Sequence, residues 1–219
     1  MKIKSPNKSP LPTGISSTVS PQPLRFRPAA GLDVSVQMKS SRSPLQNAMQ
    51  DRWLVRFSRR FESASIHGYV LDIGPEFFLL ALVSDRIWFD GFECFRVKDV
   101  RDVRRDPHAA FAETALKLRH EQIPEISPIE LDSVKQLLLT ANRLFPLLAI
   151  HREEADPHVC HIGHVVAVNR GSVTLQEIST DATWDETPAS YSLNEITRIS
   201  FGGDYENALH LVGGSFKAR

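Results

Sequence analysis

The sequence predicts a mainly-β fold of the α+β class, with two similar sets of short strands joined by a helical insertion. Strand-length apolar runs fill residues 53–103 and recur over residues 163–199. Between the two sets, apolar residues repeat at helical spacing. Sequence blocks of the first set also return in the same order in the second set. The sequence therefore predicts an internally duplicated β protein.

The first strand set begins near Trp53, where apolar residues alternate with polar ones. A strand over residues 66–74 ends in Gly-Pro, and residues 77–83 form a second strand that is apolar on both faces. Asp90-Gly91 separates two aromatic-rich runs and predicts a hairpin over residues 87–95. Residues 97–103 complete five strands in about fifty residues, which is typical of a small barrel.

The middle of the chain predicts two helices. Asp106-Pro107 supplies a cap and a first-turn proline for a helix that runs to about His120. A second helix spans about residues 128–144, where apolar residues keep near-helical spacing, and Pro146 ends it.

The second strand set matches the first block by block. Residues 163–168 match 68–73 at a constant offset, and residues 191–199 match 95–103 in a shared pattern of aromatic, aliphatic and acidic positions. If matched blocks fold alike, two triplets should be buried alike. They are Val97, Val100 and Val103 in the first set, and Leu193, Ile196 and Ile199 in the second.

These patterns divide the chain into four parts. They are a disordered basic tail over 1–48, a first small barrel over 49–105, a helical insertion over 106–144 and a second barrel over 145–214. The tail holds seven of the fourteen prolines and many serines, and such a composition does not bury enough apolar surface to offset ordering entropy. Four interpretations of the tail stay open. It could be a flexible extension, a segment with Ser-Pro sites for a proline-directed kinase, a stretch upstream of a true start at Met49, or a transit peptide.

Charge is distributed unevenly between the tail and the body. Residues 1–48 carry seven basic residues against Asp33 alone, so the remaining chain has an acidic excess. A body of that sign repels phosphate backbones unless a local basic patch overrides it.

Hydropathy and cysteine content indicate a soluble protein of the cytoplasm. No apolar run approaches the length of a membrane helix. Cys94 and Cys160 both have apolar neighbours, which suits two buried free thiols in a reducing compartment.

Each strand set resembles the Sm-like and SH3-like small barrels, over residues 62–105 and 159–212. Gly68 and Gly163 lie where Sm-like barrels place a glycine in the bent first strand, and Asp72 lies near the acidic position of that family. Sm proteins bind RNA through a loop with a basic residue and a glycine. Residues 201–204 lack the basic residue and residues 103–106 lack the glycine. The chain looks like a tandem Sm-like protein of bacterial or phage type, a group in which RNA binding is a possible role.

Basic residues of the first set are the candidate nucleic-acid contacts. With Phe57 and Phe61 between them, they show the interleaving of charge and aromatic rings found in single-strand binders. Neighbouring acids favour a second interpretation, in which these arginines form ion pairs on a solvated surface. The candidates are Arg56, Arg59, Arg60, Arg104 and Arg105.

No metal, cofactor or catalytic site is expected. His158, Cys160, His161 and His164 have the residue types of metal ligands, but along one strand they extend too far for one ion. A grouping of His67, His164 and Asp72 is one that any β protein offers. Neither cysteine has an obvious base with an orienting partner in sequence, and the Gly-Gly pairs lack the Lys-Ser or Lys-Thr of a phosphate loop.

The sequence therefore predicts a non-enzymatic binding or assembly module that acts through a strand edge or the groove between two barrels. An RNA-binding regulator of Sm type is the alternative, and an enzyme with an unrecognised site is the third possibility. Open strand edges predict a protein partner or a symmetric homo-oligomer, a dimer or a trimer.

Overall fold

The computed structural model describes residues 43–216, with ten strands and four helices in that part of the chain. Of the tail predicted over residues 1–48, residues 1–42 lie outside the described residues. The first strand set comprises β1 Leu54–Arg59, β2 Glu62–Ile73, β3 Phe77–Val83, β4 Phe89–Arg96 and β5 Val100–Arg105. The second comprises β6 Leu148–His151, β7 Cys160–Val168, β8 Ser172–Glu177, β9 Ala189–Ser192 and β10 Arg198–Phe201. The helices are α1 Pro44–Gln50, α2 Ala109–Leu118, α3 Val134–Leu144 and α4 Asp204–Gly213.

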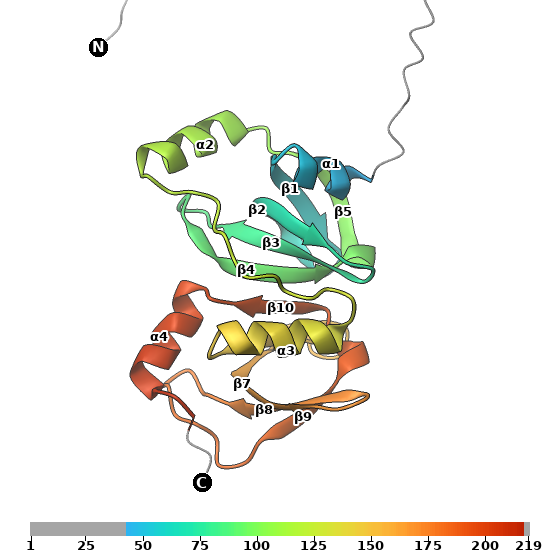
Figure 1. Ribbon diagram of the computed structural model, residues 1–219, viewed down its shortest axis with the longest axis vertical. Coiled ribbons are helices and arrows are strands. Elements are labelled where there is room, and N and C mark those ends of the chain that lie inside the picture. The colour runs from blue at the N-terminus through green and yellow to red at the C-terminus, as the bar shows by residue number, and fades with distance from the viewer. Residues whose placement is uncertain (1–42, 217–219) are drawn as a thin grey trace, which may run out of the picture. The chain divides into compact units, whose positions relative to one another are not determined.

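All ten strands belong to one antiparallel sheet in the order β5-β1-β2-β3-β4-β10-β6-β7-β8-β9. The mainly-β, α+β class is confirmed. The sheet is continuous through the middle and is not closed, so the structure shows one ten-stranded sheet in place of two separate closed barrels. Figure 1 shows β4 and β10 where the two strand sets meet.

The two halves of the sheet repeat each other in register. β2 pairs with β3 through Gly68↔Leu82, and β7 pairs with β8 through Gly163↔Glu177. Both pairs contain an irregularity at the matched position, after Val70 and after Val165. A Cβ at Gly68 would lie 2.4 Å from a backbone oxygen of β3, and one at Gly163 would lie 2.2 Å from a backbone oxygen of β8. The matched glycines therefore permit the same close strand approach, which supports the predicted duplication.

The hairpin predicted at Asp90-Gly91 is wrong. β4 runs straight through this pair, and the turn lies earlier, where the Ser84 N–H donates to the Trp88 carbonyl at 2.9 Å. The register of β3 and β4 shifts at Asp90-Gly91, between the pairs Ala81↔Phe92 and Val83↔Phe89, and Gly91 has a φ of +70°. Asp90-Gly91 therefore forms a bulge within β4. A bulge, like a hairpin turn, favours a glycine at positive φ.

The helices differ from the prediction at four places. α2 begins at Ala109 with His108 at its N-cap, so Asp106 is not the cap and Pro107 precedes the helix. α1 begins at Pro44, inside the predicted tail, with Ser43 and Gln46 forming a capping box. α3 begins at Val134, because Ser133 caps it, and the residues from 128 onward that were expected to be helical are irregular. α4 was not expected, since its residues were assigned to the second barrel.

Two apolar clusters lie on opposite faces of the central strands. Val55, Phe57, Phe78, Leu80 and Phe95 belong to one cluster, on which α1 packs. The other cluster joins the outer face of β3 and β4 to α3 and to the interior of the second strand set. Side chains of β3 alternate between the two clusters, which explains why its sequence is apolar on both faces.

The matched aliphatic triplets are buried to different degrees. Ile196 and Ile199 are 0% exposed and Leu193 is buried, as predicted. Val97, Val100 and Val103 pack against the first core but are only half-buried. Equal burial of the two triplets was therefore wrong.

The two cysteines are free, but Cys160 is exposed, which corrects the expectation that both are buried. Cys94 lies in the core of the central strands. None of the helices within residues 43–216 is both long enough and apolar enough to cross a membrane.

Candidate functional site

The junction between the strand sets holds a buried ion pair. In the pairing of β4 with β10, Glu93 lies opposite Ser200, and the Arg198 guanidinium donates to the Glu93 carboxylate. The Glu93 side chain is only 5% exposed. Burial raises the pKa of Glu93, although Arg198 opposes that rise. This pair fixes β4 against β10 at the centre of the sheet.

Arg59 reaches across the same junction. Its two terminal nitrogens donate to both Glu153 oxygens at 2.9 Å and 2.5 Å, and its side chain is 0% exposed. Burial alone would raise the pKa of Glu153, but hydrogen bonds from Arg59 and from the Thr197 hydroxyl lower it. Arg59 is thus a cross-link between the two strand sets, and its guanidinium is turned away from solvent.

Two more of the predicted nucleic-acid contacts also have acidic partners. Arg60 lies 3.3 Å from Asp99 and 2.5 Å from Glu154, and Arg105 lies 3.9 Å from Glu113. These contacts agree with the second interpretation of the arginines, that of intramolecular ion pairs.

Arg56 and Arg104 are arranged differently. They lie directly opposite each other in the pairing of β1 with β5. The Arg56 Nε donates to the Ser65 hydroxyl at 2.8 Å. Within the described residues neither arginine has an acidic partner within ion-pair distance. Like charges opposite each other destabilise a strand pair, so this position favours an anionic ligand.

β5 and β9 are the end strands of the described sheet. The Leu193 N–H donates to the Gly171 carbonyl, and β9 continues from there in register with β8. Because hydrogen-bonded and non-hydrogen-bonded residues alternate in antiparallel pairs, the Ser190 N–H points away from β8. The Asp106 N–H donates to the Leu54 carbonyl, so the same alternation turns the Arg105 N–H away from β1. Both edges therefore present backbone groups to a further strand.

The histidines near the start of β7 are not brought together. The His161 Nδ1 lies 2.9 Å from the Tyr191 hydroxyl and 3.3 Å from Glu177, whereas the His164 Nδ1 lies 3.2 Å from the Pro146 carbonyl. In residues 43–216 no group of three or more His, Cys, Asp or Glu is arranged to hold a metal ion. The His161, Tyr191 and Glu177 cluster was missed in the sequence because its members lie on three different strands.

The grouping of His67, His164 and Asp72 is not formed through any described contact. The His67 ring bonds to the Asp106 carboxylate, and the Asp72 Oδ1 accepts from the backbone N–H of Ile73. His164 contacts only the Pro146 carbonyl among its polar neighbours in the described chain.

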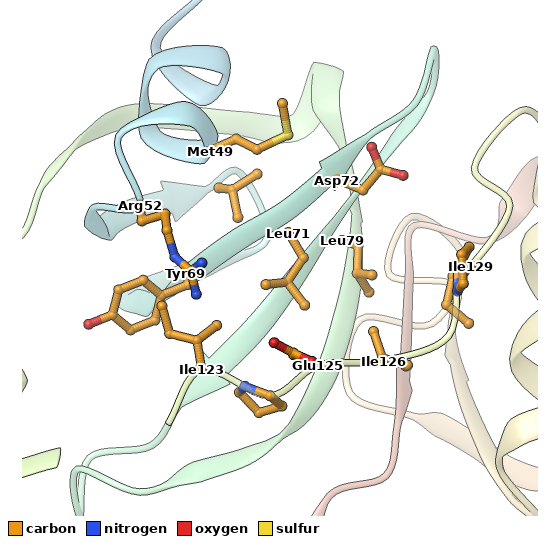
Figure 2. A pocket seen from close by; sticks show the side chains of 13 residues that line it. Met49, Arg52, Tyr69, Leu71, Asp72, Leu79, Ile123, Glu125, Ile126 and Ile129 are labelled. Atoms are coloured by element: carbon orange, nitrogen blue, oxygen red, sulfur yellow. The ribbon is translucent and has the colours of Figure 1, made fainter. Parts of the chain in front are cut away.

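A cavity of about 560 Å³ lies beside β2 and β3. Figure 2 shows Leu71 and Leu79 on the sheet and Ile123 and Ile126 on the irregular segment that follows α2. Tyr69 also lines it, and burial, with a contribution from Glu113, raises the pKa of its hydroxyl to about 12. Arg52, Asp72 and Glu125 add charged groups to the lining of the cavity (Figure 2).

Comparisons with protein-family models, curated proteins and solved structures found no match.

Proposed function

We propose that the protein is a non-enzymatic binding or assembly module of two tandem Sm-like units, each an open five-stranded half of the sheet, which acts through its open strand edges. The observation that carries this proposal is the pairing of β4 with β10. The strand orders β5-β1-β2-β3-β4 and β10-β6-β7-β8-β9 are equivalent, so the chain joins its own halves by pairing one edge strand with another. The equivalent strands β9 and β5 remain at the ends of the sheet. Bacterial or phage origin and a cytoplasmic location belong to the same proposal.

The two open edges differ in chemistry. β9 consists of Ala189, Ser190, Tyr191 and Ser192 and carries no charge. β5 carries three arginines in six residues. Two copies of β5 repel each other, whereas two copies of β9 pair about a two-fold axis without opposing charges. The module therefore forms a symmetric dimer through β9 and keeps β5 for a different partner.

Light scattering of the purified full chain tests this function. The expected mass at micromolar concentration is twice the monomer mass of 24.6 kDa. A Ser190→Pro variant should be monomeric, because proline removes the outward N–H and leaves the backbone hydrogen bonds to β8 in place, although the exposed bond between the Ser190 and Thr174 hydroxyls is lost. Arg105→Pro is the matched control on the other edge and should stay dimeric. A wild-type mass of 24.6 kDa at all concentrations would reject self-association.

An RNA-binding regulator of Sm type is the second candidate. It is favoured by the opposed and acid-free Arg56 and Arg104 on neighbouring strands. The absorbance ratio of purified protein would reveal co-purified nucleic acid. Affinity for a single-stranded oligonucleotide should then fall steeply with salt, and the slope should shrink by about 0.7 for each arginine replaced by glutamine.

A further inference from the structure

The valines of β5 pack against the first core, on which α1 also lies, but they remain partly exposed. Val100 and Val103 are half-buried, whereas their equivalents Ile196 and Ile199 are 0% exposed. The difference has a structural cause. β10 has β6 on one side and β4 on the other, whereas β5 has only β1 beside it in the described sheet. A strand added beside β5 would cover these valines as β4 covers the isoleucines.

The backbone of β5 is arranged to accept such a strand. Asp102 has a φ of +53° and lies in a bulge, so residues 103–105 are the regular part of this edge, where the outward N–H of Arg105 marks a free hydrogen-bonding position. An extended peptide that joins a sheet edge gains affinity from main-chain hydrogen bonds and specificity from alternate side chains. The free backbone groups of this edge therefore suit a partner in extended conformation and not a helical one.

The charges beside this edge specify the side chains of that strand. Arg56 and Arg104 face the same side of the β1–β5 pair, and Arg101 lies opposite Ser58 on the same strands. All three lack an acidic partner within the described residues. Carboxylates on an added strand would relieve the repulsion between the arginines and form charge-assisted hydrogen bonds.

We propose that the β5 edge binds an extended peptide segment that alternates apolar and acidic residues. Its backbone pairs with β5, its apolar side chains cover Val100 and Val103, and its carboxylates contact Arg56, Arg101 and Arg104. This inference rests on the proposed edge-binding function and names the partner of one edge. β9 of a second copy is a poor occupant because it contains no acid.

The same edge suits single-stranded nucleic acid less well. Binders of single strands stack the bases on aromatic side chains. The exposed aromatic residues of the described chain are Trp88, Phe111 and Tyr205, and none of them lies on β1 or β5. The half-buried valines also have no counterpart in a phosphate backbone.

The probe is a synthetic peptide of about seven residues that alternates valine and glutamate, added to the full-length protein. Three ligands serve as controls. One alternates valine and lysine, one has the original composition with all valines before all glutamates, and one is a single-stranded oligonucleotide of the same charge. Calorimetry gives the affinity, and hydrogen exchange reports the backbone amides of residues 100–105. We expect the alternating acidic peptide to bind best and to slow exchange in β5.

Variants assign the binding to the edge. Arg104→Glu should weaken binding by about tenfold or more, because an attraction becomes a repulsion. Arg170→Glu, an exposed arginine beyond β7, is the matched control and should leave affinity unchanged. Arg101→Gln provides a milder variant if charge reversal at residue 104 disturbs folding, and it should weaken binding several-fold.

Three results would overturn the inference. They are no binding of the acidic peptide at millimolar concentration, equal binding of the block-order peptide, and equal affinity in Arg104→Glu and wild type. Preferential binding of the oligonucleotide would also overturn the inference, and nucleic acid would then be the ligand of this edge. Light scattering of the same samples separates the two proposals, since dimerisation through β9 does not depend on Arg104.

Discussion

At the residue scale, the arginines separate into two classes that the sequence does not distinguish. Arg59 is paired with Glu153, which is 94 residues away in the chain, and Arg60 with Glu154. Arg56 and Arg104 face each other without an acid in the described chain. The sequence placed all of them near local acids, and only the fold shows which carboxylates they reach. The basic patch could be predicted, but its division into cross-link and binding surface could not.

Replacing Arg59 by methionine should destabilise the fold by about 3–5 kcal/mol, because Glu153 is left buried without its partner. Arg105→Met is the matched control, because its side chain is 58% exposed and that of its partner Glu113 is 37% exposed, so its loss should cost only about 0–1 kcal/mol. Urea unfolding at neutral pH measures both. Equal small losses in the two variants would show that Arg59 does not hold the strand sets together.

His151 predicts a pH dependence of stability. Burial, followed by the charge of Arg198, lowers its pKa from 6.5 to about 3. Between these two values the unfolded chain binds a proton that the folded chain does not, so the free energy of unfolding decreases as pH falls from about 6.5 toward 3. The slope from this one group is at most about 1.4 kcal/mol per pH unit. His151→Gln should flatten the profile between pH 5 and 6.5, and an unchanged profile would contradict the assignment.

At the element scale, period-2 patterns and repeated glycines predicted the strands and their duplication, because alternation and close strand approach are local requirements. Asp90-Gly91 misled because a glycine at positive φ suits a bulge as well as a hairpin turn. α1 was missed because it has only seven residues and lies next to a Pro- and Ser-rich segment. α4 was missed because its residues, which follow Gly202-Gly203, were assigned to the second barrel.

The bulge in β4 makes a prediction about Gly91. A Cβ there would lie 2.4 Å from the Gly203 backbone nitrogen, and the φ of +70° disfavours any side chain. Gly91→Ala should therefore destabilise by about 1–3 kcal/mol. Gly171→Ala is the control, because nothing lies within 4 Å of its Cβ position, and it should change stability by no more than about 0.5 kcal/mol. Thermal unfolding of both variants distinguishes these outcomes.

At the scale of the whole molecule, one sheet runs through both halves and ends in two chemically distinct edges. The continuous sheet was not predicted, because β4 and β10 are far apart in the chain and no local sequence pattern indicates that they pair. A double variant supplies a test of this junction. Because Glu93 is buried with Arg198 as its partner, Arg198→Met should lose about 3–5 kcal/mol of stability and Glu93→Gln with Arg198→Met should recover part of it. Additive losses in urea unfolding would contradict a shared junction.

The central claim is that the open edges bind other chains, and hydrogen exchange of the β9 amides tests it most directly. The Ser190 N–H has no partner within the described sheet, so in a monomer it should exchange as fast as an exposed loop. Pairing with a second copy predicts slow exchange at high protein concentration and fast exchange on dilution below the dissociation constant. Fast exchange of Ser190 at every concentration would contradict the account.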